Sequence, residues 1–568
     1  MKKLLQLALA GLVLLSLPGR SLRAQNAADP TMTSGMQHDM TPGVAPSAMM
    51  IIPMMKNPML PGMQGSRPKT TDWLPGQGVD LSTLPEAKPR QLVELKDGDT
   101  LDLKAMMVRR TINNKQFAMY GYNGQYPGPL VKVKQAATIY VRFTNNIDLP
   151  STVHWHGVRL DNKSDGVPGL TQSEVAPGGT FFYTIHFRDA GIYWYHPHIR
   201  EDIQQDMGLY GNLMVEPSEA GYYSPVNSEE VLMLDDLLFD GDNLVPYGKE
   251  GANFVIMGRF GTRLLVNGET HYHKEAHKGD VVRFFLTNVS NTRTFNLNFG
   301  VPVKLVAGDI SRFEKEQMVR SVVIAPAQRY VVEARYDKEG DYTISNNIVA
   351  LDHMLGEFFT AMDTVGMVMV DGAPATPDHA KAFATLRQNA TVKAEIDQYR
   401  AEFSRPPDYE LSVAVEMKDL PIIMLHFISI DTIFRSPVEF TDTMSDMNWI
   451  ATSREVRWIM KDKATGKENM DIPLQAKVGT VTKIRIVNDP KSFHPMNHPM
   501  HLHGQRMLVV ARDGEPVTDF AWSDTVLIPV GQTADLLVEN SNPGKWMLHC
   551  HIAEHLEAGM MAVLTVTP

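Results

Sequence analysis

The sequence lacks several features that would place it in common classes of protein. It contains one cysteine, Cys550, so no disulfide can form within a chain. It has no basic excess, because Lys and Arg total 54 against 65 Asp and Glu, a formal net charge of −11. Nucleic acid is therefore not an expected partner, since nothing would neutralise its phosphates. No apolar run beyond the N-terminal segment is long enough to span a bilayer, so no stable membrane anchor is expected.

The N-terminal segment, residues 1–24, has the pattern of a secretory signal peptide. Lys2 and Lys3 precede an apolar stretch over residues 4–17, and Leu22-Arg-Ala24 is a plausible cleavage site. No twin arginine precedes the apolar stretch, which favours a Sec-type route. We therefore predict an exported protein, periplasmic where the cell has an outer membrane. A lone thiol in an oxidising compartment is a liability unless something binds it, so Cys550 is a candidate functional residue.

Residues 25–88 are rich in helix and strand breakers and show little periodicity, which predicts a flexible leader. Nine methionines lie between Met32 and Met63. Thioether sulfur is a soft ligand that suits Cu(I), so we expect the leader to bind cuprous ion; the alternative is that methionine is simply frequent in this sequence. Further methionines of the C-terminal region are interpreted as core-filling residues. They are Met417, Met424, Met444 and Met447.

From residue 89 onward, short runs of alternating apolar and polar residues predict an all-β protein. A repeated pattern sets the number of domains. Each copy has a turn followed eleven residues later by a glycine that opens a strand. The turns end at Thr180, Arg329 and Thr533, and the glycines are Gly191, Gly340 and Gly544. The sequence therefore predicts three β-sandwich domains over 89–218, 228–372 and 410–568, with a polar linker of helical character over 373–409.

Ten of the nineteen histidines fall in four short groups within the first and third repeats. The groups are His154/His156, His196/His198, His498/His501/His503 and His549/His551/His555. Residues i and i+2 of a strand point to the same face, so each His-x-His pair presents two imidazoles together. The second repeat has Asn296, Asn298 and residues 345–347 (Ser-Asn-Asn) at these places. Clustered neutral imidazoles indicate a metal, and imidazole suits Cu, Zn, Fe and Ni.

Cys550 distinguishes among these metals. Together with His498, His555 and Met560 it forms two imidazoles, one thiolate and one thioether, the ligand set of a blue-copper electron-transfer site. A structural zinc site could use Cys and His but would leave eight further histidines unexplained. On a strand, His549 and His551 would face away from Cys550. The same strand then contacts a one-electron centre on one side and an imidazole cluster on the other.

These four histidine motifs resemble those of the three-domain multicopper oxidases, which include laccases, ascorbate oxidase and bacterial cuprous oxidases. The resemblance covers residues 89–568. It implies three consecutive cupredoxin-like Greek-key β-sandwich domains that hold four copper ions. The implied type 1 ligands are His498, Cys550, His555 and Met560, and the implied type 2 ligands are His154 and His501. The implied type 3 ligands are His156, His196, His198, His503, His549 and His551.

The resemblance also implies the reaction, in which four one-electron oxidations reduce dioxygen to two waters. Asp165 matches a family position near the type 2 copper, although it is equally explained as a turn residue before Gly166. Several bacterial relatives carry a proton-delivering acid directly after the last histidine, where this chain has Leu556. Glu554 and Glu557 are therefore candidates to replace it.

Three functions fit this pattern. The first is a cuprous oxidase of copper tolerance with laccase-like activity on phenols, and the second is a general laccase for phenolic or other organic reductants. The third is an exported copper carrier without turnover, which would not need the complete ligand set. A monomer is expected in each case.

Overall fold

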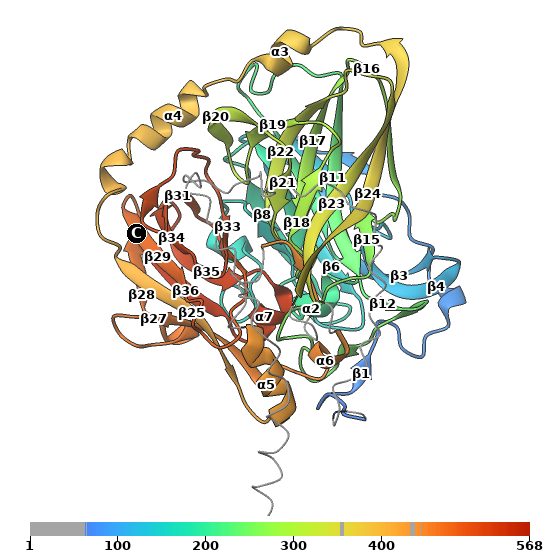
Figure 1. Ribbon diagram of the computed structural model, residues 1–568, viewed down its shortest axis with the longest axis vertical. Helices are drawn as coiled ribbons and strands as arrows, with labels where there is room; N and C mark the ends of the chain where they lie inside the picture. Colours follow the sequence, from blue (N-terminus) through green and yellow to red (C-terminus); the bar gives the residue numbers. More distant parts are fainter. Residues whose placement is uncertain (1–62, 64, 353–356, 432–437, 443–444) are drawn as a thin grey trace, which may run out of the picture. The chain divides into compact units, whose positions relative to one another are not determined.

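The structure is a computed structural model, and it describes residues 63, 65–352, 357–431, 438–442 and 445–568. The predicted signal peptide and most of the predicted leader lie outside these residues. The described chain is almost entirely β-structure, as predicted (Figure 1). No helix among the described residues is long and apolar enough to cross a membrane.

The first sandwich packs a four-stranded sheet against a five-stranded sheet around one core. In spatial order, the first sheet contains β4 (Lys115–Tyr122), β3 (Thr100–Ile112), β6 (Thr138–Asn146) and β8 (Thr180–His186). The second contains β2 (Leu92–Glu94), β5 (Leu130–Lys134), β10 (Gly211–Glu216), β9 (Gly191–His196) and β7 (His154–His156).

The second sandwich consists of two larger sheets and its own core. One sheet contains β15 (Arg263–Val266), β11 (Ser228–Leu237), β17 (Val281–Asn288), β22 (Arg329–Arg335), β19 (Val303–Ala307) and β20 (Arg312–Val319). The other contains β16 (Tyr272–Lys278), β24 (Glu357–Pro374), β23 (Gly340–Asp352), β18 (Phe295–Asn298) and β21 (Val322–Ile324), with β26 (Phe440–Thr441) paired to β23.

The third sandwich follows the same plan. Its first sheet contains β27 (Val456–Asp462), β25 (Tyr409–Met417), β29 (Val481–Asn488), β34 (Thr533–Glu539), β31 (Arg506–Arg512) and β32 (Glu515–Pro516). Its second contains β28 (Leu474–Lys477), β36 (Met561–Thr567), β35 (Gly544–Cys550), β30 (His498–Leu502) and β33 (Thr525–Ile528). Met424 and Met447 are buried in its core and Met417 packs against it partly buried, in agreement with their interpretation as core-filling residues, whereas Met444 lies outside the described residues.

Short helices connect these sheets. The segment between the second and third sandwiches contains α3 (Ala380–Ala384), α4 (Ala390–Asp397) and the 3₁₀ turn η3 (Arg400–Glu402), which gives it the expected helical character (Figure 1). The remaining helices are α2 (Glu201–Gln204), α5 (Ile422–Asp431), α6 (Ser445–Asn448), α7 (Ala553–Glu557), η1 (Leu81–Thr83), η2 (Asn162–Ser164) and η4 (Asn469–Asp471).

The sequence repeat corresponds to a structural repeat. Gly191, Gly340 and Gly544 each open a strand with φ of +146°, +143° and +140°, a backbone conformation that side chains larger than glycine rarely adopt. An asparagine at or next to the last residue of β6, β17 and β29 lies beside the turn that precedes each of these repeats' glycines, because its backbone N–H donates to the carbonyl of Gly179, Gln328 or Gln532. Asn145, Asn288 and Asn488 each donate hydrogen bonds to two backbone carbonyls of the adjoining loops. The three sandwiches are thus built with the same local devices.

The end of the predicted leader differs from the expectation of a flexible segment. In this segment β1 (Asp72–Trp73) pairs with β14 (Tyr247–Gly248), and Trp73 is buried in the first core. Met63 is 1% exposed and belongs to the third core. Burial of the Trp73 and Met63 side chains removes apolar surface from water, which favours an attached segment over a flexible one. A further pair of short strands, β12 (Phe239–Asp240) and β13 (Asn243–Leu244), forms a hairpin.

Candidate metal centre

Strand pairing positions the histidines. In the first sandwich β7 and β9 are antiparallel with His154 opposite His196. In the third sandwich β30 and β35 are antiparallel with His501 opposite His549. Each pairing therefore brings two of the predicted histidine motifs side by side, one motif on each strand.

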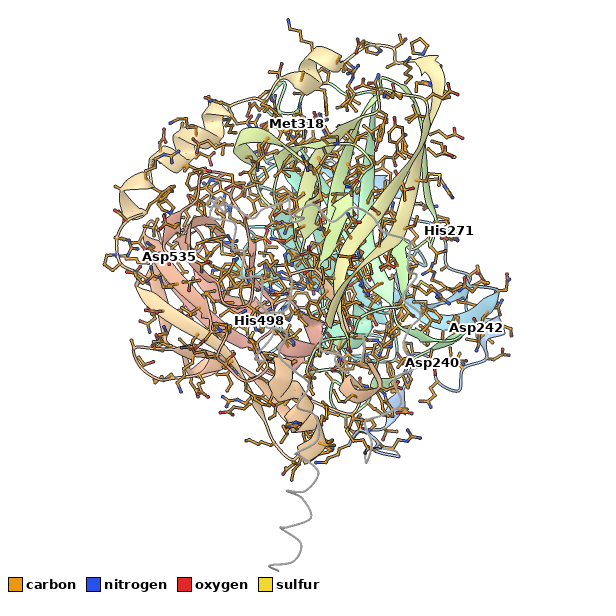
Figure 2. All side chains as sticks on the ribbon, in the orientation of Figure 1. Asp240, Asp242, His271, Met318, His498 and Asp535 are labelled. Atoms are coloured by element: carbon orange, nitrogen blue, oxygen red, sulfur yellow. The ribbon has the colours of Figure 1, made fainter. Side chains whose placement is uncertain are left out.

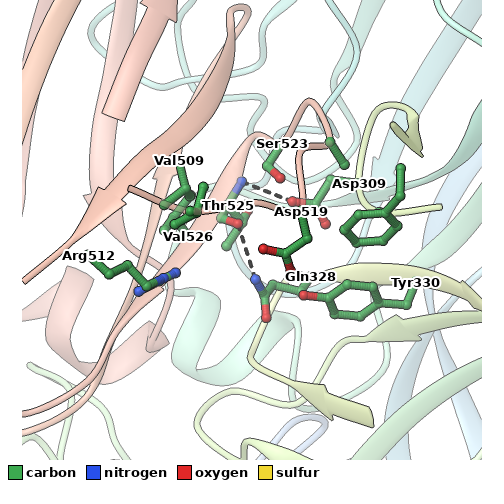
Figure 3. Close-up of a pocket in the computed structure, with 13 residues that line it drawn as sticks. Asp309, Gln328, Tyr330, Val509, Arg512, Asp519, Ser523, Thr525 and Val526 are labelled. Carbon is green, nitrogen blue, oxygen red and sulfur yellow. Dashed lines mark hydrogen bonds between the residues drawn. The ribbon is translucent and has the colours of Figure 1, made fainter. Parts of the chain in front are cut away.

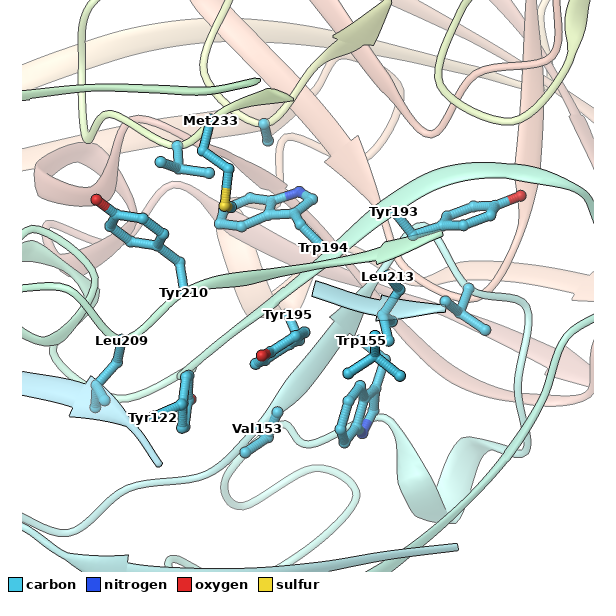
Figure 4. Packing of buried hydrophobic residues seen from close by; sticks show 14 of the residues in the cluster. Tyr122, Val153, Trp155, Tyr193, Trp194, Tyr195, Leu209, Tyr210, Leu213 and Met233 are labelled. Atoms are coloured by element: carbon cyan, nitrogen blue, oxygen red, sulfur yellow. The ribbon is translucent and has the colours of Figure 1, made fainter. Parts of the chain in front are cut away.

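The residues between the histidines determine which way the imidazoles point. Trp155 is fully buried in the first core, with its ring 5.6 Å from that of Tyr195 (Figure 4). Because strand side chains alternate, burying Trp155 on the core side turns His154 and His156 to the other face. A one-residue slip of β7 would move the indole into the place of the imidazoles and the imidazoles into the apolar core.

The two pairs of strands face each other, so that eight imidazoles from two sandwiches form one buried cluster. The His156 and His501 rings stack with centroids 3.7 Å apart, and those of His154 and His503 are 3.9 Å apart. His503 Nε2 lies 3.0 Å from His549 Nε2 and 3.3 Å from His198 Nε2. The members are His154, His156, His196, His198, His501, His503, His549 and His551. The sequence analysis predicted these eight residues, and the structure brings them together.

The protonation of this cluster suits a metal. Burial, together with the neighbouring imidazoles, holds the pKa of His156, His196 and His549 well below the usual range, so these rings are neutral. Several ring nitrogens have no hydrogen-bond partner although they are fully buried, among them Nε2 of His154, His196 and His501. A buried lone pair without a partner is costly. Neutral imidazoles with unpartnered nitrogens directed at one another therefore fit metal ions.

The outward nitrogens of the cluster are held by backbone and carboxylate oxygens. His154 Nδ1 lies 2.8 Å from the Asp165 carbonyl oxygen, and His503 Nδ1 lies 3.0 Å from Asp165 Oδ2. His501 Nδ1 lies 2.9 Å from the Asp524 carbonyl oxygen. When the Nδ1–H donates to such an oxygen, the Nε2 lone pair remains available to a metal, the usual arrangement around metal-binding histidines.

A second cluster lies on the other face of β35. Cys550 Sγ is 3.6 Å from His498 Nδ1 and 3.8 Å from His555 Nδ1, and all three side chains are buried (Figure 2 labels His498). Met560 is also fully buried in this core, and its carbonyl oxygen accepts a hydrogen bond from the Cys550 backbone. The Trp458 ring stacks on His555 with centroids 4.0 Å apart.

The donor atoms of this second cluster call for a cation. Burial raises the pKa of the Cys550 thiol far above its usual range and lowers the pKa of His498 to about 3. The thiolate would therefore form only with a bound metal ion beside it, and the two imidazoles are already neutral. The sulfur accepts a hydrogen bond from the Ile552 backbone N–H at 3.5 Å, which further stabilises a negative sulfur. One soft sulfur and two imidazoles fit copper.

The three predicted acids have different surroundings. Asp165 belongs to the imidazole cluster through the contacts above. Glu554 accepts hydrogen bonds from Thr292 Oγ1 at 2.9 Å and Asn291 Nδ2 at 3.2 Å, and burial raises its pKa to about 8. Glu557 accepts a hydrogen bond from the Glu201 backbone N–H at 3.2 Å, and burial with nearby Asp202 raises its pKa to about 7. Leu556 packs in a small apolar cluster with Val167 and Met547.

The sequence analysis missed two acids that contact the imidazole cluster. Glu201 is buried at the start of α2, and its Oε1 lies 3.1 Å from His198 Nδ1. Its position three residues after His198 was a signal that could have been used. Asp524 is fully buried, and its Oδ1 lies 3.0 Å from His156 Nε2. Asp524 is 368 residues from His156 in the chain, so only the fold reveals this contact.

The fold and the two clusters together define a class, that of cupredoxin-like metalloproteins with a thiolate–imidazole cluster beside a larger imidazole cluster. Comparison with known proteins identifies the family within this class. Two family models described as multicopper oxidase match residues 104–220 and 436–568.

Relatives and solved structures agree. Laccase-1 of Cryptococcus neoformans is 26% identical over 79% of this chain and 77% of its own length. A multicopper oxidase of Mycobacterium tuberculosis is 26% identical over 77% of this chain and 81% of its own. The solved structure of a multicopper oxidase from Campylobacter jejuni, described as a metallo-oxidase, aligns with a TM-score of 0.64 and 21% identity, covering 89% of this chain and 99% of that one. The chain belongs to the multicopper oxidase family. It is an oxidoreductase that uses copper, with dioxygen as electron acceptor and a reductant as substrate.

Proposed function

We propose that this protein is an exported cuprous oxidase, which turns Cu(I) into Cu(II) and also oxidises phenols in the manner of a laccase. One observation carries the electron-transfer part of this proposal. Cys550 Sγ approaches two imidazoles on one face of β35, while the adjacent His549 reaches His503 on the other face. A single residue step therefore connects the two clusters by a short covalent path.

The copper assignment is the one that the family resemblance implies, and the arrangement of the two clusters supports it. His498, Cys550, His555 and Met560 would hold the type 1 copper, and His154 and His501 would hold the type 2 copper. When bound, these coppers and the type 3 pair supply the one-electron steps that move four electrons from the reductant to dioxygen. The type 3 ligands are His156, His196, His198, His503, His549 and His551. Met560, the proposed thioether ligand, is buried in the same core as Cys550.

The acids hold the protons that the reaction consumes, four for each dioxygen reduced to two waters. Asp165 is placed for the imidazole cluster because its carboxylate lies 3.0 Å from His503 and 3.4 Å from His154. Glu557 lines an open pocket with Glu416 and Lys418, and it contacts the backbone of Glu201, which in turn contacts His198. This sequence of contacts favours Glu557 as the acid nearer to solvent. Glu554 contributes from within the protein, beside Thr292.

The choice of Cu(I) as physiological substrate rests on the methionines between residues 32 and 62, because soft thioether groups capture cuprous ion. The second candidate, a general laccase with organic reductants, is favoured by the relative named Laccase-1. Export rests on the signal-peptide pattern of residues 1–24.

Deletion of residues 32–62 tests the choice of substrate; the deletion stops before Met63 because that side chain is buried. We expect kcat/KM for Cu(I) to fall at least tenfold while kcat/KM for a bulky phenol is unchanged. A matched variant keeps the length of the leader but replaces its methionines by serine, and we expect the same selective loss. Equal retention of both rates would contradict the cuprous role and favour the general laccase.

A further inference from the structure

A buried arginine of the second sandwich, the one without histidine motifs, reaches the imidazole cluster of the other two. Arg329 is the first residue of β22 and occupies the repeat position where the other sandwiches have Thr180 and Thr533. Its side chain is fully buried. A guanidinium is rarely buried without strong hydrogen-bond partners, so the contacts of Arg329 indicate its structural role.

All five N–H groups of the Arg329 side chain have acceptors. Nη1 and Nη2 donate to the two carboxylate oxygens of Asp524 at 2.7 and 2.5 Å. Nε donates to the Ile192 carbonyl at 3.2 Å, Nη1 also donates to the Ala327 carbonyl at 3.2 Å, and Nη2 to that of Asp309 at 3.0 Å. Ile192 belongs to the first sandwich, Ala327 and Asp309 to the second, and Asp524 adjoins β33 of the third. The Arg329 side chain therefore forms hydrogen bonds with residues of all three sandwiches.

Asp524, the carboxylate that Arg329 grips, contacts one imidazole from each histidine-bearing sandwich. Its Oδ1 lies 3.0 Å from His156 Nε2 and accepts a hydrogen bond from Thr525 Oγ1 at 2.8 Å. Its backbone carbonyl lies 2.9 Å from His501 Nδ1. His156 and His501 are the two rings that stack most closely across the boundary between the sandwiches. Bidentate contact with a planar guanidinium fixes the direction of a carboxylate, which a single charge would not do.

The backbone of the first sandwich makes room for this pair. A Cβ at Gly157 would lie 2.4 Å from Arg329 Nη2 and 2.5 Å from Asp524 Oδ2. Gly157 also has φ of +82°, so glycine is required there for two reasons. The glycine that follows His154-Trp-His156 therefore allows the ion pair to approach the histidine strand.

The second sandwich also supports the other side of the pair. Asp309 Oδ1 accepts a hydrogen bond from the Arg329 backbone N–H at 2.8 Å, and its Oδ2 accepts one from the Thr525 backbone N–H at 3.2 Å. Figure 3 shows Asp309 and Thr525 lining a pocket between the second and third sandwiches, together with Gln328, Asp519 and Arg512. Asp309 thus holds both ends of the Arg329–Asp524 pair in register.

We propose that Arg329 is a positioning residue for the type 2 and type 3 copper ligands: by clamping Asp524 it holds His156 and His501 in the orientation that metal binding requires. The inference rests on the copper assignment proposed above. It gives the second sandwich a role in the chemistry although it contributes no ligand. Outer contacts of metal-bound histidines commonly change metal affinity 10- to 100-fold when removed.

The test compares copper-loaded wild-type protein with Arg329→Gln and a matched control, Arg159→Gln. Arg159 is also a buried arginine with a bidentate carboxylate partner, Asp189, and it likewise bridges two sandwiches through Glu539. No imidazole is among its hydrogen-bond partners. The measurements are copper per chain during competition with a chelator, the blue absorbance of the type 1 site, and the electron paramagnetic resonance signal of the type 2 copper.

For Arg329→Gln we expect type 1 absorbance of wild-type strength, at least tenfold weaker retention of the other coppers and an altered type 2 resonance signal. Arg329→Lys keeps the positive charge but cannot make the bidentate contact with Asp524. It should therefore restore copper retention only in part. Arg159→Gln should match the wild type. Wild-type retention and resonance in Arg329→Gln would overturn the inference, as would equal copper loss in Arg159→Gln, which would indicate general loosening of the sandwiches.

Two further results separate other failures. If Arg329→Gln does not fold, Asp524→Asn removes the clamped charge at nearly constant volume, and the same selective copper loss is expected; an unchanged resonance signal in that variant would overturn the inference. If the wild-type protein itself binds fewer than four coppers under full loading, the proposed function fails, and the role of Arg329 with it.

Discussion

The second and third sandwiches have the same fold, but only the third carries histidines on the strands that form the imidazole cluster. In the third, β30 and β35 place His501 opposite His549 at the centre of the imidazole cluster. In the second, the equivalent strands β18 and β23 carry asparagine and serine, and Asn298 lies opposite Ser345. The two sandwiches therefore share a strand arrangement, and the side chains on two of those strands determine whether a sandwich can bind a metal.

The strand pairing in the second sandwich also differs in register from that in the third. In the sequence repeat Asn296 corresponds to His501, and Ser345 to His549. The register of β18 and β23 is nevertheless shifted by two residues, because Asn298 rather than Asn296 lies opposite Ser345. On its other edge, β23 pairs with β24 with an irregularity between Ile344 and Ser345. A shift of two keeps the same side chains on the same face. The polar side chains then bond to one another: the Asn296 backbone N–H donates to Asn346 Oδ1, and its side chain donates to Glu439 Oε1 at 3.3 Å.

The largest effect is expected from removing the thiolate of Cys550, which has no counterpart in the second sandwich. Cys550→Ser should abolish the intense blue absorbance and the oxidation of both Cu(I) and phenols, because a serine hydroxyl cannot supply the soft anionic sulfur that copper requires. The fold should remain, since the two side chains are nearly equal in size. The measurements are the visible spectrum, oxygen uptake and circular dichroism of copper-loaded protein. Retained blue colour would contradict the assignment of Cys550.

An intermediate effect is expected at Asp165. Replacing Asp165 by Asn leaves the backbone carbonyl beside His154 but removes the charged oxygen beside His503. We expect the rate of oxygen uptake to fall 10- to 100-fold, the range found when an outer partner of a metal-bound histidine is lost. Asp161→Asn is the matched control, because Asp161 is exposed in the same turn and its side chain accepts a hydrogen bond from the Lys163 backbone N–H. Equal rates in the two variants would favour the interpretation of Asp165 as a turn residue.

Local sequence patterns predicted the ligands, and they could not predict the residues that support them. The strand spacing of His154 and His156, or of His549 and Cys550, is local and follows from the alternation of side chains. Asp524 and Arg329 reach the same cluster from distant parts of the chain, and neither lies in a histidine motif. Their role depends on how three sandwiches pack together.

The N-terminal segment before the first sandwich also depends on a long-range contact that the local sequence pattern could not predict. Prolines and glycines correctly indicate that residues 65–88 contain little regular structure, yet the segment is attached to the folded chain. Two contacts attach it, the pairing of β1 with β14 and the burial of Trp73. A two-residue strand has no periodicity to recognise in a sequence. Its partner, 175 residues further along, supplies the missing information.

The smallest effect should come from the polar cluster of the second sandwich, and it should concern stability rather than turnover. Glu439 is 4% exposed, and burial raises its pKa to about 7, whereas an unfolded glutamate titrates near pH 4.3. A raised pKa in the folded state means that its contribution to stability is complete below about pH 4 and is lost as the pH rises through 7.

Glu439→Gln removes this titration and keeps an oxygen for Asn296. Between pH 5 and 7 the unfolding free energy of the variant should therefore rise relative to wild type by at most about 1.4 kcal/mol per pH unit. Oxygen uptake should be unchanged, because Glu439 contacts the asparagine cluster rather than the imidazoles. Thermal unfolding across this pH range measures the difference, with exposed Glu94→Gln as a control that should follow the wild type. Parallel curves for Glu439→Gln and wild type would contradict the raised pKa of Glu439 in the folded protein.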